Sequence, residues 1–256
     1  MSGIPTKITV RVIARNGKFL GDDIGGALVT IRDVHSGELL ASGRSHGGSG
    51  PTTLMTCPQT RNQPIPTKNL PHNNACRFDA TLRLETARLV EISAYGPLAA
   101  QQSANRVTAT TWIYPGKDIS PESGQEDGFL LEIPGLVVQV LGPPAHYFPS
   151  KPNPQQAIPI LANVTMMCGC PIGATSSPWP YTDFEVVATV LHNGVQNEFP
   201  LQFETAAPAP SQFSTSQWTP GEYGVFEITV HAYQKSTGNT GVDRTSVNLA
   251  QPSAAS

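Results

Sequence analysis

The chain has 256 residues, of which 39% are apolar and 14% charged, and its formal net charge is −3. This composition suffices for the core of one large domain or two ordinary ones, and it excludes both a basic nucleic-acid-binding face and a disordered acidic chain. Glycine (23) and proline (24) are spread between short apolar runs, a pattern typical of many strands joined by turns, so we predict an all-β protein.

The N-terminal stretch MSGIPTKITVRV contains no apolar run long enough for a secretory signal. No stretch of about 18 uninterrupted apolar residues, as a membrane-spanning helix needs, occurs in the sequence. We therefore expect a cytoplasmic location by default, with an exported one left open.

Residues 7–12 alternate apolar and polar side chains, which predicts a half-buried strand that ends at Asn16-Gly17. A hairpin is predicted next, from a strand over 28–33 that returns over 38–41. Further strands are expected in 78–96 and 106–114, and together these strands form a first domain over residues 1–116.

A polar loop, residues 44–77, interrupts this first domain. Loops of this length in compact domains are usually functional or disordered, so we take it as a candidate contact surface. Cys57 and Cys76 lie near its centre and its end. They are predicted to be a loop-closing disulfide, two metal ligands together with His72, or two free thiols, and the disulfide alternative requires an oxidising compartment.

The stretches ITVRVIARNGKFLG, GALVTIRDVHSGELLASG and LVEISAYG resemble the prealbumin-like, carboxypeptidase-regulatory type of β-sandwich. The resemblance covers about the first 115 residues and rests on strand pattern and turn residues. It implies a noncatalytic module that accompanies an enzyme or receptor, and it implies no site residue.

The polar segment 117–128 is predicted to be a linker, and residues 129–256 a second domain that opens with FLLEIPGLVVQVLGPP. The connection 145–159 contains four prolines and is expected to run extended over a surface, with Tyr147 and Phe148 as anchors. It is our second candidate contact surface.

Apolar residues alternate from Phe184 to Val190 before Asn193-Gly194, the pair favoured in type I′ hairpin turns. Later strands are expected in QFSTSQW, YGVFEITVHAYQ and TGVDRTSVNL. The stretch PGEYGVFEITVHAYQKSTGNTG is similar to the last hairpin of bacterial immunoglobulin-like domains. The sequence therefore predicts two tandem β-sandwiches, one prealbumin-like and one immunoglobulin-like.

The segment NVTMMCGCPIG, residues 163–173, contains half of the chain's methionines and cysteines. In an extended strand, Met166, Cys168 and Cys170 would share one face and present three soft ligands suited to copper or, for the thiolates, zinc. His192 or His231 would complete such a metal site. The alternatives are plain core packing, because these residue types are often buried, and a redox-active dithiol, which Gly169 would permit in a turn.

No serine–histidine–aspartate spacing, nucleophile elbow or phosphate loop occurs in the sequence. We therefore predict a noncatalytic accessory protein with a protein partner, no nucleic acid and no membrane span. The first alternative is a copper- or zinc-binding protein, and a dithiol redox protein ranks lower.

Overall fold

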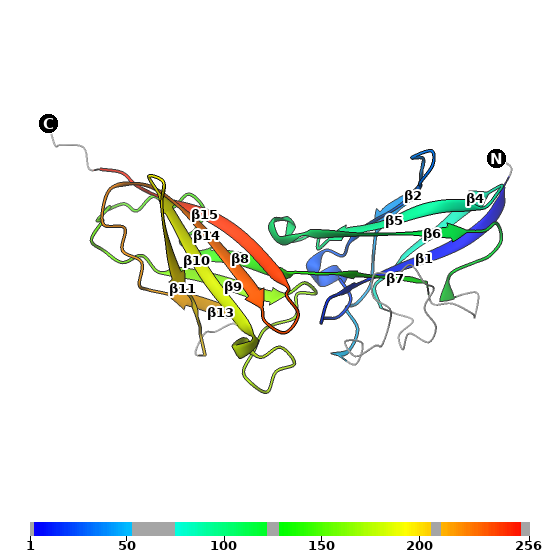
Figure 1. The fold of residues 1–256 in the computed structure, drawn as a ribbon. Coiled ribbons are helices and arrows are strands. Elements are labelled where there is room, and N and C mark those ends of the chain that lie inside the picture. Colours follow the sequence, from blue (N-terminus) through cyan, green and yellow to red (C-terminus); the bar gives the residue numbers. More distant parts are fainter. Residues whose placement is uncertain (1–2, 53–74, 122–127, 206–210, 252–256) are drawn as a thin grey trace. The chain divides into compact units, whose positions relative to one another are not determined.

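The computed structural model describes residues 3–52, 75–121, 128–205 and 211–251. The regular structure in these residues is almost entirely β, with four sheets divided between two compact units (Figure 1). Unit 1 comprises Met1–Gly135 and Met167–Cys170, and unit 2 comprises Leu136–Met166 and Pro171–Ser256. Each unit contains two sheets, which confirms the prediction of an all-β chain built of β-sandwiches. No helix formed by the described residues is long and apolar enough to cross a membrane.

Unit 1 has one sheet of order β4-β1-β7 and a second of order β3-β2-β5-β6. In the first sheet β1 (Ile4–Ala14) pairs antiparallel with β4 (Phe78–Leu84) and parallel with β7 (Phe129–Ile133). The strands of the second sheet are all antiparallel to their neighbours: β2 (Leu28–Asp33), β3 (Leu39–Arg44), β5 (Arg88–Gly96) and β6 (Asn105–Ile113). The hairpin predicted from a strand over 28–33 that returns over 38–41 is therefore β2–β3.

The position of β7 corrects the predicted start of the second domain. Phe129–Ile133 pairs with β1 and belongs to unit 1, and unit 2 begins at Leu136. Ile119, in the segment predicted to be a linker, forms a bridge with Ile8 of β1. An apolar strand pattern that follows a polar segment does not indicate which sheet the strand joins. Here the parallel pairing of Phe129–Ile133 with β1 places the strand in unit 1.

Strand β1 is buried on both faces, although its alternation predicts a half-buried strand. Arg11 is 1% exposed, and its Nη1 donates to the carbonyl oxygen of Ala75 at 2.8 Å. Its guanidinium carbon also lies 5.9 Å from the ring centroid of Phe19. Phe19 and Ala75 thus form part of a small second core that covers the outer face of the sheet, and they satisfy the buried cation.

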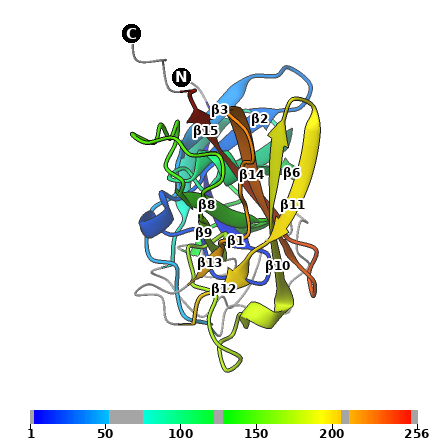
Figure 2. The same ribbon diagram turned by 90° about the vertical axis from the view of Figure 1, so that its left-hand side faces the viewer.

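Unit 2 consists of a sheet of order β11-β10-β14-β15 and a sheet of order β12-β13-β9-β8 (Figure 2). The first contains β10 (Phe184–His192), β11 (Val195–Pro200), β14 (Gly224–Gln234) and β15 (Thr240–Leu249). The second contains β8 (Leu136–Gly142), β9 (Ile160–Met166), β12 (Gln202–Phe203) and β13 (Gln212–Thr215). Short 3-10 turns occupy Asp22–Ile24, Gln101–Ser103 and Tyr181–Asp183.

The β10–β11 hairpin forms as its turn residues predict. Asn193 has φ of 48° and Gly194 has φ of 79°, the positive values that a type I′ turn requires at both central residues. The two-residue turn fixes the register in which His192 faces Val195. Alternate residues of β10 and β14 are therefore buried in the core of unit 2, as the period of two predicts.

Candidate functional site

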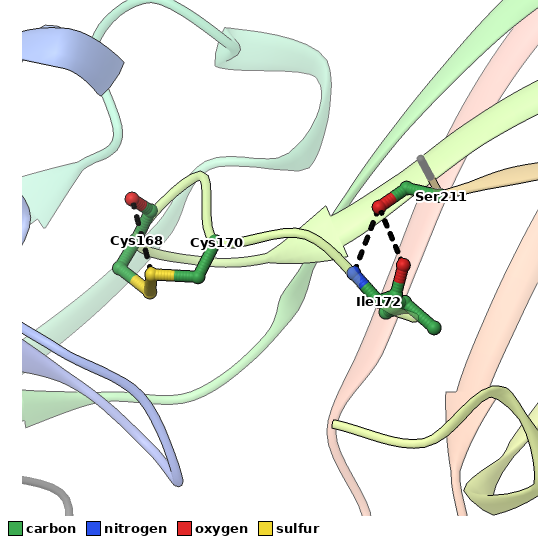
Figure 3. The surroundings of a disulfide bond; sticks show 4 residues. All are labelled: Cys168, Cys170, Ile172 and Ser211. Carbon is green, nitrogen blue, oxygen red and sulfur yellow. Dashed lines mark hydrogen bonds between the residues drawn. A yellow bond between two sulfur atoms is a disulfide. The ribbon is translucent and has the colours of Figure 1, made fainter. Parts of the chain in front are cut away.

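The sulfur cluster is a turn, not a strand. β9 ends at Met166, and Gly169 takes a left-handed φ of 75°. Cys168 and Cys170 form a disulfide with their Cα atoms 5.4 Å apart (Figure 3). The expectation that Met166, Cys168 and Cys170 share one strand face is therefore wrong, because the backbone leaves the extended conformation after Met166.

Burial of the cluster favours the packing alternative. Met166, Met167 and Cys168 are 0% exposed, and Cys170 is 6% exposed. In unit 1, a Cβ added at Gly17 would lie 3.3 Å from the Cys168 sulfur. Within unit 2, the Ser211 hydroxyl accepts from the N–H of Ile172 at 2.8 Å and donates to its carbonyl oxygen at 3.3 Å (Figure 3). These bonds fix the backbone two residues after Cys170.

The metal-site hypothesis receives no support from the described residues. They contain no group of three histidine, cysteine, aspartate or glutamate side chains placed to hold a metal ion. Cys168 and Cys170 are joined to each other, so neither offers a thiolate. His231 lies on the exposed face of β14, between Val187 and Val242 of the neighbouring strands. Copper or zinc binding therefore stays a prediction, and no geometry favours it.

The second cysteine pair is described only in part. Cys57 lies outside the described residues, as does most of the 44–77 loop. Cys76 is buried and forms no disulfide with any residue that the structure describes. Burial raises the pKa of the Cys76 thiol, and a hydrogen bond with Ser45 partly opposes that rise. The thiol is therefore protonated near neutral pH and is a poor nucleophile.

The 145–159 connection lies against the β15 edge of unit 2. The Tyr147 N–H donates to the carbonyl oxygen of Ser246 at 3.0 Å, and the Asn248 N–H donates to the Tyr147 carbonyl oxygen at 2.9 Å. These two bonds fix the backbone beside Phe148, whose side chain is 64% exposed. An aromatic side chain that is both exposed and held at its backbone can act as an anchor at low entropic cost.

Two hollows of unit 2 are lined by residues next to Phe148 in the chain, although Phe148 itself lines neither. One has a volume of about 300 Å³ and is lined by His146, Glu227 and Arg244 among others. The other has a volume of about 280 Å³ and includes Tyr147 and Lys151. Aromatic residues and arginine are enriched at protein interfaces. The exposed Phe148 and the Arg244 that lines one hollow are residues of these types.

His192 occupies a different site, which the sequence did not reveal. Its Nδ1 lies 2.7 Å from the carbonyl oxygen of Val225, and its ring stacks on Phe226 with the centroids 4.1 Å apart. Its Nε2 lies 3.2 Å from a carboxylate oxygen of Glu222. These partners lie about 30 residues further along the chain, and no spacing motif links them to His192.

No protein-family model matches the sequence, and no curated protein is similar enough to count as a match. Among solved structures, the fibronectin(III)-like modules of CbhA from Clostridium thermocellum align with 11% identity, a TM-score of 0.27, and coverage of 96% of this chain and 94% of theirs. A tetra-tandem repeat from the extending region of a large adhesion protein aligns with 10% identity and a TM-score of 0.30, over 94% of this chain and 49% of that one.

The titin domains Z1Z2, solved in complex with telethonin, align with 8% identity and a TM-score of 0.24 over 99% of this chain and 100% of theirs. At these identities and TM-scores the similarities carry no argument about the fold or the function of this chain.

Proposed function

We propose that the chain is a noncatalytic interaction protein whose second unit binds a protein partner through the Phe148 surface. This surface consists of Phe148 and the two hollows that its chain neighbours His146, Tyr147 and Pro149 help to line. The observation that carries the proposal is the combination of a 64% exposed aromatic ring with a backbone hydrogen-bonded to β15. A partner that covers the ring removes its apolar area from water without first having to order the segment.

The accessory role of unit 1 belongs to the same proposal. The prealbumin-like resemblance is supported by the β2–β3 hairpin and its pairing with β5, which form over the residues that carry the resemblance. In this role unit 1 accompanies the binding unit and contributes no catalytic group.

Site-specific photo-crosslinking tests the proposal. A photoreactive phenylalanine analogue is placed at position 148 of the full chain, and separately at Tyr114, an aromatic residue of unit 1 that is 55% exposed. In extract of the source cells, position 148 should crosslink to one protein that position 114 does not capture. Phe148→Ala should then abolish copurification of that protein while the unfolding midpoint stays unchanged. Equal crosslinking from both positions, or copurification that survives Phe148→Ala, contradicts the proposal.

A further inference from the structure

Strand β11 is an open edge of its sheet. It pairs with β10 on one side, and no described residue pairs with its other side. Five of its six residues are exposed, including Val195 at 61%. Open edges present unpaired backbone donors and acceptors, which makes them templates for pairing with another strand.

The hairpin register decides which backbone groups face outward. A two-residue turn closes on a hydrogen-bonded pair, here His192 and Val195, and hydrogen-bonded and non-hydrogen-bonded pairs then alternate along an antiparallel ladder. Gln196 and Glu198 therefore direct their N–H and C=O groups away from β10. Pro200 has the same orientation but has no N–H, so the edge able to pair spans about five residues.

A hollow of about 340 Å³ lies beside this edge. The inward-facing side chains of β11, which are Val195, Asn197 and Phe199, line it. The two sheets of unit 2 face each other so that β8 lies against β15, which leaves β12 on the β11 side of the sandwich. Because β12 has only two residues, these side chains of β11 lack an opposing strand. The volume falls at the lower end of the range for ligand pockets.

The floor of the hollow is aromatic and rigid. Trp218 and Phe226 are each 3% exposed, and their rings meet edge to face with the centroids 5.5 Å apart. The Ile158 N–H donates to the carbonyl oxygen of Trp218 at 3.0 Å, which fixes the loop that carries the tryptophan. The apolar floor is thus formed before any partner arrives.

One wall of the hollow is polar and carries negative charge. The His192 ring is in the tautomer whose Nδ1 donates to the carbonyl oxygen of Val225. Its Nε2 then accepts from the Asn193 side-chain amide at 2.9 Å and has no proton to donate to Glu222. The Glu222 carboxylate, 65% exposed, is the charged side chain among the lining residues, and Glu198 is the charged residue of β11. No lysine or arginine lies on β11 or in the lining.

We propose that this edge and hollow, which we call the β11 groove, bind an extended segment of another protein that carries an arginine or lysine. The segment adds a strand to β11 through the backbone groups of Gln196 and Glu198, and its basic side chain enters the hollow. The aliphatic part of that side chain packs on Trp218 and Phe226, and its charged end reaches Glu222. Strand addition supplies affinity, and the carboxylate supplies selectivity.

Defined peptides test the proposal on the full chain. They are about six residues long, the usual strand length, alternate threonine and valine, and differ only at one central position. That position holds arginine, leucine, phenylalanine or glutamate. Backbone amide NMR shifts report binding, and the arginine peptide should move the signals of Gln196 and Glu198 and bind about tenfold more tightly than the leucine peptide.

Matched variants separate the backbone contribution from the charge. Gln196→Pro removes an outward N–H and leaves the β10 ladder intact, so it should abolish binding, while Gln196→Ala should retain it. Glu222→Lys should weaken binding of the arginine peptide by about tenfold and favour the glutamate peptide instead. Val195→Lys should also block binding, whereas Val225→Lys, a 55% exposed position on the opposite face, should not.

Several outcomes would overturn the β11 groove proposal. No shift with any peptide at millimolar concentration excludes strand addition, and equal or tighter binding of the phenylalanine or glutamate peptide excludes a basic occupant. Concentration-dependent self-association that Gln196→Pro abolishes would show that a second copy of this chain is the occupant. Phe148→Ala is included throughout and should leave peptide binding unchanged, so failure here is distinct from failure of the Phe148 surface.

Discussion

The two edge strands of the β11-β10-β14-β15 sheet differ in whether another segment of the chain covers them. At the β15 edge the chain folds back on itself, and Tyr147 forms two backbone hydrogen bonds with the strand. At the β11 edge no described residue takes that place, and protection consists of Glu198 and the missing N–H of Pro200. One sheet thus has a covered edge that presents an aromatic anchor and an open edge beside a hollow.

The covered side of the sheet also packs more closely. A Cβ at Gly241 of β15 would collide with the carbonyl oxygen of Leu136 in β8 and would lie 3.0 Å from a methyl carbon of Val138. Close approach of β15 to β8 therefore requires glycine at this position. On the open side the facing strand is only two residues long, and the space is left as the hollow.

The largest expected effect comes from breaking the close approach on the covered side. Gly241→Val forces backbone or side-chain shifts between β15 and β8, and we expect it to lower the stability of unit 2 by about 1 to 3 kcal/mol. Denaturant unfolding measures this change. The control is Gly48→Ala, since an added Cβ there meets nothing within 4 Å, and its unfolding midpoint should shift far less. Equal shifts would show that the contact with Leu136 is not tight.

Removing the cover from the β15 edge should have a smaller effect. Tyr147→Pro deletes the N–H that donates to Ser246, and it also disfavours the left-handed φ of 54° at His146, because residues before proline prefer extended conformations. A lost hydrogen bond of this kind costs about 1 kcal/mol.

Hydrogen exchange provides the measurement for this variant. The Asn248 amide, which donates to Tyr147, should lose protection in Tyr147→Pro and keep it in Tyr147→Phe. Amides of the β10–β11 hairpin should be unaffected by either change. Retained protection at Asn248 in the proline variant would mean that the edge is covered by something other than this contact.

A third test compares two hairpins that form sheet edges. The β10–β11 turn depends on the backbone of Asn193 and Gly194, whereas the β2–β3 turn depends on a carboxylate. Hydrogen bonds from Ser36, first its backbone N–H and then its hydroxyl, together with Arg88 and the His35 N–H, lower the pKa of Asp33 to about 2 from the ordinary 3.8.

The sign of the pH effect follows from that lowered pKa. Above pH about 4 the stabilising contacts of Asp33 are fully present, and as pH falls from about 4 to 2 the unfolded chain takes up the proton first, so stability is lost. Exchange protection in β2–β3 should therefore fall in this range before protection in β10–β11 does. Asp33→Asn should remove this difference in acid sensitivity between the two hairpins. Identical acid sensitivity of both hairpins in the unchanged chain would contradict the role of Asp33.

Strand positions were largely predictable from the sequence because they depend on local alternation and turn residues. The Asn193-Gly194 hairpin and the buried alternation from Phe226 to Ala232 appear as expected. Sheet membership was not predictable, since the parallel pairing of β7 with β1 joins segments more than a hundred residues apart. The burial of Arg11 depends in the same way on the distant Ala75.

The candidate sites were less predictable than the strands. The sulfur cluster was recognisable by composition, but its conformation depends on the left-handed Gly169 and on which sulfurs meet. Phe148 was identifiable because a proline-rich connection carries few aromatic residues. The hollow at β11 was not identifiable from the sequence, because Trp218 and Glu222 come near His192 only when β10 and β14 pair.

The smallest expected effect is a gain of self-association at the open edge. Replacing Glu198 and Pro200 together by valine removes the charge and restores an outward N–H, so β11 gains the features of an unprotected edge. We expect weak dimers with a dissociation constant of about 1 mM, measured by sedimentation at increasing concentration. Glu227→Val removes the same charge from β14, a strand paired on both sides, and should remain monomeric. Dimerisation of both variants would attribute the effect to lost charge, and dimerisation of neither would mean that the open edge is protected by more than these two residues.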